Sequence, residues 1–165
     1  MKAKTLETLF HETLKDIYYA ERKVLRALPK MARGAQSAEL KSAFEQHKDE
    51  TQGHVERLQQ VFDLIGKPAR GKTCPAIDGI LEEGEEALED FADSPALDAS
   101  LVAAAQAVEH YEIARYGTLC RWAKTLGLTE AGKLLDATLQ EEGATDKALT
   151  KIAEGSVNKA ALMAA

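Results

Sequence analysis

The stretch that decides the fold is Val108-Glu109-His110-Tyr111-Glu112-Ile113-Ala114-Arg115-Tyr116, midway along a run that reads as one long helix. In a helix, residues three or four positions apart share a face. Glu112 therefore lies on a stripe with Val108 and Leu119, and Glu109 lies at the edge of that stripe. The stripe is otherwise apolar, so it predicts a face turned toward a core. An isolated carboxylate in a core loses its charge or needs a compensating partner, and we expect that partner to be a metal ion.

Length and composition bound the class of protein. The chain has 165 residues, of which 45% are apolar and 29% charged, which favours one globular domain over the whole chain. The formal net charge of −6 argues against a nucleic-acid partner, because phosphate binding needs a basic surface. No apolar run approaches the roughly 20 residues of a membrane span, and no secretory signal is evident. The two cysteines form no Cys-x-x-Cys pair, so we expect a cytoplasmic protein without a zinc ribbon or rubredoxin centre.

The apolar residues recur at helical spacing in five segments, so the predicted fold class is all-α. Thr5 and Ser37 are expected to cap the first two helices, and Ser94 to cap the fourth, with Pro95 in its first turn. A tail of uncertain order, either a short extra turn or a frayed end, is expected at 156–165. The predicted helical segments are 5–34, 37–66, 76–92, 94–127 and 129–155.

The lengths of the connections predict the topology. Two short turns make one hairpin of the first and second segments and another of the last two. Between the hairpins, the segment 66–94 is long enough to run back along a bundle, and it carries the short acidic helix. The second long helix and the third should therefore run parallel. This is the connectivity of a ferritin-like four-helix bundle with one long crossover.

Acidic residues lie near the midpoint of every predicted long helix. Midpoints share one level in a bundle of similar helices, whichever way each helix runs, and these acids also fall on or beside the apolar stripes. We therefore expect their carboxylates to converge at one depth, where like charges repel strongly at low dielectric. The acids are Glu21, Glu50, Glu109, Glu112 and Glu142.

Two metal ions would resolve this repulsion. Carboxylates with a few imidazoles suit iron, with manganese or zinc as alternatives, and glutamates can bridge two such ions. The usual di-iron pattern places a histidine three residues after a glutamate on two helices, and this chain departs from it. Nitrogen and oxygen ligands are available instead at His47, His54 and Asp146, all on predicted inner faces.

Other interpretations of the same residues remain open at this stage. An inner-face glutamate is often a boundary residue whose head group reaches solvent, and acids are almost never fully buried alone. His47 or His54 could be a hydrogen-bonded core histidine rather than a ligand. His110 is expected to point away from the acidic centre, and Tyr116 to be a core residue or a hydrogen-bond donor beside it.

The chain resembles the bacterial YciF/YciE family, a ferritin-like group of unknown function. The likeness rests on Tyr19-Ala20-Glu21, His47-x-x-Glu50-Thr51, the run from Val108 to Leu119, and Glu141-Glu142-x-x-Thr145-Asp146, and it covers nearly the whole chain. The resemblance implies a rubrerythrin-like di-metal site, a homodimer and a link to stress response. It carries the metal-ligand role to Glu21, Glu50, Glu109, Glu112 and Glu142, with His47 beside them, and it supplies no substrate.

These observations lead to two hypotheses of different class. In the first, the protein is a di-iron carboxylate protein that reduces peroxide or oxidises Fe(II) with H₂O₂ or O₂. In the second, it is a non-catalytic stress or structural protein whose metal ions stabilise the bundle. The absence of a Cys-x-x-Cys electron-entry site favours the second, and the acidic composition argues against a DNA-protecting mini-ferritin.

Overall fold

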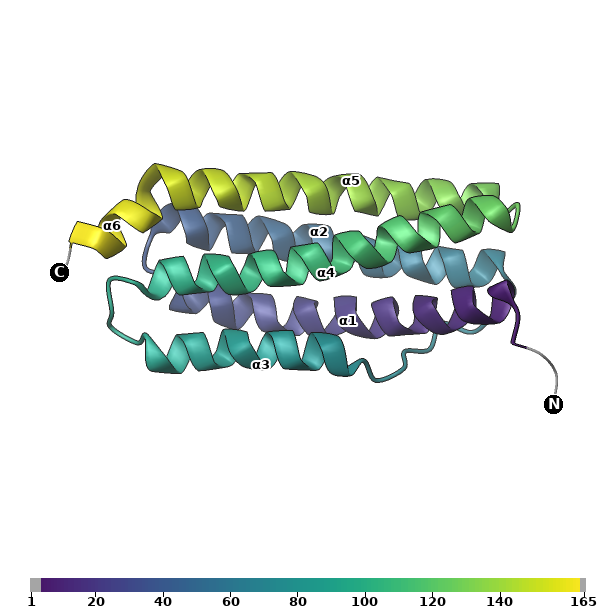
Figure 1. The fold of residues 1–165 in the computed structure, drawn as a ribbon, viewed down its shortest axis with the longest axis horizontal. Helices are drawn as coiled ribbons and strands as arrows, with labels where there is room; N and C mark the ends of the chain where they lie inside the picture. Colours follow the sequence, from purple (N-terminus) through teal and green to yellow (C-terminus); the bar gives the residue numbers. More distant parts are fainter. Residues whose placement is uncertain (1–3, 164–165) are drawn as a thin grey trace.

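The computed structural model describes residues 4–163, and every regular element in that range is helical. Four long helices form a bundle, and a shorter helix lies alongside it (Figure 1). No helix of the described chain is long and apolar enough to cross a membrane. The elements are α1 Leu6–Gly34, α2 Ala38–Leu64, α3 Pro75–Asp90, α4 Leu97–Thr125, α5 Thr129–Ile152, a π-helical turn Ala153–Val157 and α6 Asn158–Met163.

The first two predicted helix starts are confirmed, and the third is not. Thr5 accepts a hydrogen bond from the amide of Thr8, and Ser37 accepts one from the amide of Leu40. Ser94 does not cap α4, because its hydroxyl accepts from the amide of Ala96 in a turn that precedes the helix. The helix begins at Leu97, two residues after Pro95.

The chain directions follow the predicted crossover. In Figure 1, α1 and α2 form one antiparallel hairpin, and α4 and α5 form the other. The helix α3 follows α2 in the chain and runs back along the outside of the bundle before α4 begins. The helices α2 and α4 consequently run in the same direction. Around the bundle α1 packs on α2, α2 on α5, α5 on α4 and α4 on α1, while α3 covers α1 and α4 from outside. The single ferritin-like crossover predicted from the loop lengths is therefore present.

A carboxylate joins the two hairpins at one end of the bundle. Asp98, in the first turn of α4, is buried and accepts hydrogen bonds from the amides of Gln36 (2.7 Å) and Ser37 (2.8 Å). These amides belong to the α1–α2 turn and have no partner within a helix. The contact fixes the height of α4 relative to the first hairpin, and with it the height of the acids that α4 carries.

The C-terminal segment continues as helix. The predicted end of the last long helix at Gly155 falls inside the π-helical turn, and α5 itself ends at Ile152. Val157 is buried, so the turn is anchored to the core, and α6 follows it. The extra-turn alternative predicted for this segment is the one observed up to Met163, and residues 164 and 165 lie outside the described range.

Candidate metal centre

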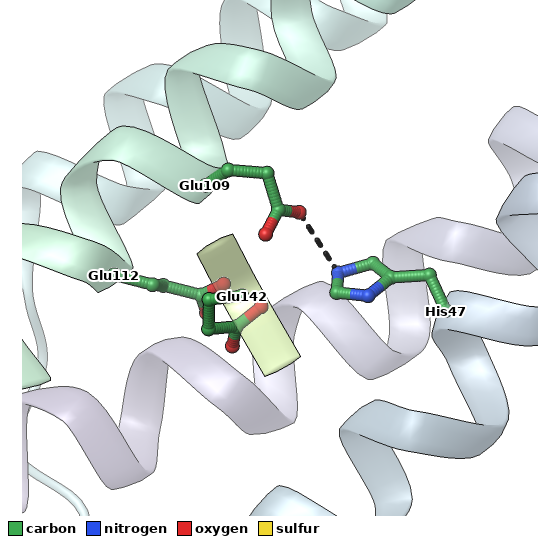
Figure 2. Close-up of side chains that lie close together, drawn as sticks. All are labelled: His47, Glu109, Glu112 and Glu142. Carbon is green, nitrogen blue, oxygen red and sulfur yellow. Dashed lines mark ion pairs between the residues drawn. The ribbon is translucent and has the colours of Figure 1, made fainter. Parts of the chain in front are cut away.

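Six acidic and imidazole side chains meet inside the bundle at mid-height. Each of the four long helices supplies at least one of them, and α2 and α4 each supply two. All six are buried, and four of them (Glu21, His54, Glu112 and Glu142) are 0% exposed. Figure 2 shows Glu109 and Glu112 reaching from α4 toward Glu142 and toward the ring of His47. The boundary-residue interpretation is therefore wrong for Glu21, Glu109, Glu112 and Glu142, whose head groups do not reach solvent.

The six side chains form two groups that share one residue. In each group, one ligand atom from every residue lies within 4.8 Å of the others, which is close enough to surround one metal ion. Glu142 belongs to both groups, so its carboxylate stands between them. The first group is His47, Glu109, Glu112 and Glu142, and the second is Glu21, His54 and Glu142.

The contacts inside the groups are short, yet they lack hydrogen-bond geometry. His47 Nε2 lies 2.9 Å from Glu109 Oε1, and His54 Nδ1 lies 3.0 Å from Glu142 Oε1. Both nitrogens, both oxygens of Glu112 and both oxygens of Glu142 nevertheless have no hydrogen-bond partner. Buried polar atoms in proteins are rarely left in this state, and each such atom calls for an explanation.

A shared cation would account for this spacing. A metal bonded at about 2.1 Å to two ligands at right angles holds those ligands roughly 3.0 Å apart. The lone pairs of both ligands then point at the ion rather than at each other, so the two atoms are close without a hydrogen between them. The observed separations of 2.9 Å and 3.0 Å match this arrangement. The two groups could therefore each hold a metal ion, and their residues fit one.

Burial raises the pKa of most of the carboxyl groups. The pKa of Glu112 lies well above its ordinary value because the side chain is desolvated and faces Glu21, Glu142 and Glu109. Burial likewise raises the pKa of Glu21, and it raises that of Glu109 to about 8. Each of these shifts favours the protonated carboxyl group, and Glu109 is largely protonated at neutral pH in the absence of a metal. Metal binding would displace those protons, because only the carboxylate form is a ligand.

The histidines and Glu142 shift in the opposite sense. Burial by itself would lower the pKa of His47, but the neighbouring carboxylates of Glu109 and Glu50 outweigh it and raise the pKa to about 10. The same competition raises the pKa of His54 to about 11, through Glu142 and Glu21. Burial would raise the pKa of Glu142, and the contact with His54 lowers it instead. Without a metal, the cluster thus holds charges of opposite sign together with bound protons. A metal cation could displace those protons and compensate the carboxylates in their place.

The ion pair of Arg57 and Glu141 orients His54 through the ring nitrogen that faces away from the cluster. Arg57 donates two hydrogen bonds to the carboxylate of Glu141, at 2.6 Å and 2.7 Å. Glu141 Oε2 also lies 2.9 Å from His54 Nε2, and an ionised carboxylate can only accept, so Nε2 carries the hydrogen. His54 Nδ1 therefore faces the cluster, and its lone pair would become available to a metal ion that displaces the second ring proton. Buried metal-binding histidines commonly have such a carboxylate behind them.

Tyr116 supports the second group from α4. This tyrosine is fully buried, and its hydroxyl donates to Glu21 Oε1 at 2.5 Å. The contact directs the carboxylate toward His54, whose Nδ1 lies 3.5 Å from the same oxygen, Oε1. The other oxygen of Glu21, Oε2, has no hydrogen-bond partner. The predicted role of Tyr116 as a hydrogen-bond donor beside the acids is confirmed.

Two of the predicted ligands lie outside both groups. Glu50 is about one-third exposed, and its carboxylate accepts hydrogen bonds from Gln46 (2.9 Å) and Thr145 (3.3 Å). Its Oε2 lies 3.9 Å from His47 Nδ1, which is beyond hydrogen-bond distance. Thr51, the next residue, occupies the fully buried position on α2 instead.

Asp146 points to the outer side of the α4–α5 contact. Its Oδ1 accepts from Gln106 at 3.0 Å and lies 3.1 Å from the exposed His110. His110 is exposed, as predicted. Conversely, Arg57 and the hydrogen-bonding role of Glu141 were missed by reasoning from the sequence. Only knowledge that α2 and α5 are antiparallel neighbours would have paired them.

Comparison with known proteins identifies the family. The model of a domain of unknown function, DUF892, matches residues 5–162. The chain belongs to the DUF892 family. A curated relative is protein YciF of Escherichia coli strain K12, which is 45% identical to this chain over 162 residues. The match covers 98% of this chain and 98% of YciF. The resemblance inferred from the motifs is thereby confirmed.

Solved structures agree with this assignment. The crystal structure of the E. coli stress protein YciF matches with a TM-score of 0.90 and 45% identity, covering 95% of this chain and 99% of the other. A Rhodopseudomonas palustris protein, YcfI, described provisionally as structural, matches with a TM-score of 0.87 and 46% identity over 90% of this chain and 95% of the other. A Xanthomonas campestris protein shares the fold alone, with a TM-score of 0.71 at 24% identity over 93% of this chain and 94% of that one.

Proposed function

We propose that this chain binds two metal ions, most readily iron, and uses them to react with peroxide or dioxygen. The first ion would be held by His47, Glu109, Glu112 and Glu142, and the second by Glu21, His54 and Glu142, with Glu142 bridging. The observation that carries the proposal is the set of buried nitrogens and oxygens that approach one another to 2.9–3.0 Å without hydrogen bonds. Asp146 is left out of the ligand set because its carboxylate is already bonded to Gln106.

The donor set favours iron or manganese over other metals. Four carboxylates and two imidazoles make a hard, oxygen-rich environment, which suits Fe and Mn better than it suits the soft ions that prefer thiolates. Neither cysteine belongs to the two groups. Zinc remains an alternative, since it also accepts histidine and carboxylate ligands.

The bound metal would supply Lewis acidity and electrons for the reduction of the oxidant. The residues of the chain would do the rest. His54 is oriented by Glu141 and Arg57, and Tyr116 holds Glu21 in place. Glu50, at the edge of the cluster, has its Oε2 3.9 Å from Nδ1 of His47 and would help to orient that ring.

An anaerobic iron titration followed by oxidation tests the proposal. Metal-free protein is loaded with Fe(II), H₂O₂ or O₂ is added, and the rate and stoichiometry of oxidation are followed by absorbance. We expect saturation at two Fe(II) per chain and a rate well above that of free iron. Glu142→Ala, which removes the shared ligand, should abolish both, whereas Glu130→Ala at the exposed start of α5 should change neither. Oxidation of wild type indistinguishable from that of free iron contradicts the proposal, provided that circular dichroism shows intact folding.

A second candidate function is a non-catalytic metal-stabilised protein. It is favoured by the description of the R. palustris relative as structural and by the absence of a Cys-x-x-Cys pair that could receive electrons. Both candidates require metal binding, and only the first requires rapid oxidation. Thermal unfolding with and without metal, measured beside the oxidation rate, separates them, because a purely structural site raises the melting temperature and leaves the rate at the background value.

A further inference from the structure

A cavity of about 330 Å³ lies directly beside the first group of candidate ligands. Its opening lies between α2 and α5, where the exposed residues Gln46, Ala144 and Ala148 form the rim. The cavity then passes inward to α1 and α4, and Leu81 of α3 contributes to the wall. His47, Glu50 and Glu109 line it as well, so it is continuous with the candidate metal centre.

Small side chains leave the room that the cavity occupies. Ala27 of α1, Ala43 of α2 and Ala105 of α4 line it on three different helices. Protein interiors are close-packed, and an apolar hole left by small side chains weakens a core unless something fills it. Most of the remaining lining is apolar and includes Leu28 and Phe44, so the inner part of the cavity favours an apolar occupant over water.

The size and chemistry of the space define a class of ligand. A buried apolar cavity of about 150 Å³ holds one benzene molecule, so about 330 Å³ has room for a hydrocarbon of roughly eight to ten carbons. Ligand pockets typically begin near 300 Å³ and combine apolar walls with a few polar groups. Here the polar side chains of the lining are Gln46, His47, Glu50, Glu109, Glu141 and Thr145. Among them Glu109 is buried, and its Oε2 has no hydrogen-bond partner.

We propose that this cavity binds an alkyl or aryl molecule of about eight to ten carbons with one neutral hydroxyl-type head group, placed at His47, Glu50 and Glu109. A hydroxyl can donate to a carboxylate oxygen and can also accept from a protonated ring or carboxyl group, whereas a carboxylate head group would meet the negative charge of Glu50 at the same place. The inference deepens the proposed function, since an organic molecule beside the ions would make organic hydroperoxides better oxidant substrates than H₂O₂. The binding itself needs no metal.

Binding of 1-octanol to the metal-free protein tests the proposal, with calorimetry and amide NMR shifts as readouts. We expect saturable binding of one molecule per chain, with shifts at the residues that line the cavity. Octanoate should bind at least several-fold more weakly than 1-octanol. Ala105→Leu, which fills the cavity from α4, should weaken 1-octanol binding at least tenfold, and Ala27→Leu, which fills it from α1, serves as a second variant if the first does not fold. Ala103→Leu, at an exposed position on α4 outside the cavity, should bind as wild type does.

Failure of this inference is distinguishable from failure of the metal proposal. Absence of saturable binding, equal binding by wild type and both filled variants, or tighter binding of octanoate than of 1-octanol would each overturn the inference. The Fe(II) stoichiometry of the filled variants is measured in parallel. We expect it to equal that of wild type, because neither Ala27 nor Ala105 belongs to the ligand groups.

Discussion

Glu141 lies 2.9 Å from His54 and fixes which nitrogen of that histidine faces the buried acids. The pKa of Glu141 is lowered by its hydrogen bonds with Arg57, so the carboxylate is ionised and accepts the Nε2 hydrogen. Successive hydrogen bonds thus connect Arg57, at the bundle surface, through Glu141 to His54 in the cluster. Glu141 is in neither candidate group, yet these hydrogen bonds let it orient a residue that is.

Loss of this support should weaken metal binding without unfolding the protein. Glu141→Gln keeps the shape of the side chain and removes the charge that holds both Arg57 and His54. We expect the affinity for Co(II) or Fe(II) to fall about 10–100-fold, as is typical when the partner of a metal-binding histidine is changed. Glu130→Gln, an exposed change on the same helix, is the matched control. Equal affinities for both variants would contradict the role of Glu141.

Metal affinity should rise with pH. Below pH 8 the carboxyl group of Glu109, with its pKa of about 8, is largely protonated in the metal-free protein, and His47, with its pKa of about 10, carries a proton as well. Each proton that the metal must displace makes the metal affinity rise by about tenfold per pH unit. We therefore expect affinity to increase between pH 6 and pH 8, with proton release seen by calorimetry in buffers of different ionisation enthalpy. A flat profile would exclude these residues as ligands.

Removing one buried acid should stabilise the metal-free protein. The pKa of Glu112 is raised above its value in the unfolded chain, so the folded state retains a proton that the unfolded state loses above about pH 4.5. Stability due to this group consequently falls as pH rises from that point. Glu112→Gln has no such proton, and we expect it to raise the free energy of unfolding by about 1–3 kcal/mol at pH 7.5.

The gain from Glu112→Gln should shrink at pH 5, because that pH lies close to the ordinary carboxyl pKa of 4.5 and the unfolded chain loses its proton far less completely than at pH 7.5. Chemical denaturation at both pH values measures it, with Glu130→Gln as the surface control. The same variant should lose metal affinity, which is the trade between stability and function expected of a binding site. A destabilised variant at pH 7.5 would show that the carboxyl group is not costly to bury.

The link between the two hairpins should also be measurable. Asp98→Ala leaves the amides of Gln36 and Ser37 without their buried acceptor. Hydrogen bonds to charged groups contribute about 1.5–3 kcal/mol, so we expect a loss of about 2–3 kcal/mol in the free energy of unfolding. Asp90→Ala, at the exposed end of α3, should cost less than about 0.5 kcal/mol. A similar loss for both would show that Asp98 does not hold the hairpins together.

The sequence sufficed for the bundle and for most of the cluster, because both depend on spacing along single helices. Midpoint position placed Glu21, Glu109, Glu112 and Glu142 at one depth, and apolar periodicity turned them inward. These two rules could not decide whether Glu50 or Thr51 faces the inside of the bundle. The two differ by about 100° around the helix axis, and both lie near the stripe.

Contacts between helices decided the remaining positions. The rotation of α2 against α5 places Thr51 inside and leaves Glu50 partly in solvent, and the α4–α5 contact turns Asp146 toward Gln106. The cavity was equally invisible in the sequence, since alanines on separate helices are ordinary helix formers until the fold brings them together. The periodicity of a single helix carries no information about how helices are rotated against one another or about the cavity that they enclose.

Anomalous diffraction from crystals of the protein loaded with Fe(II) or Co(II) tests the central claim most directly. The account predicts two peaks per chain inside the bundle, one bounded by His47, Glu109, Glu112 and Glu142 and the other by Glu21, His54 and Glu142. Metal bound only at surface acids, or no peak among these six side chains at full loading, would contradict it.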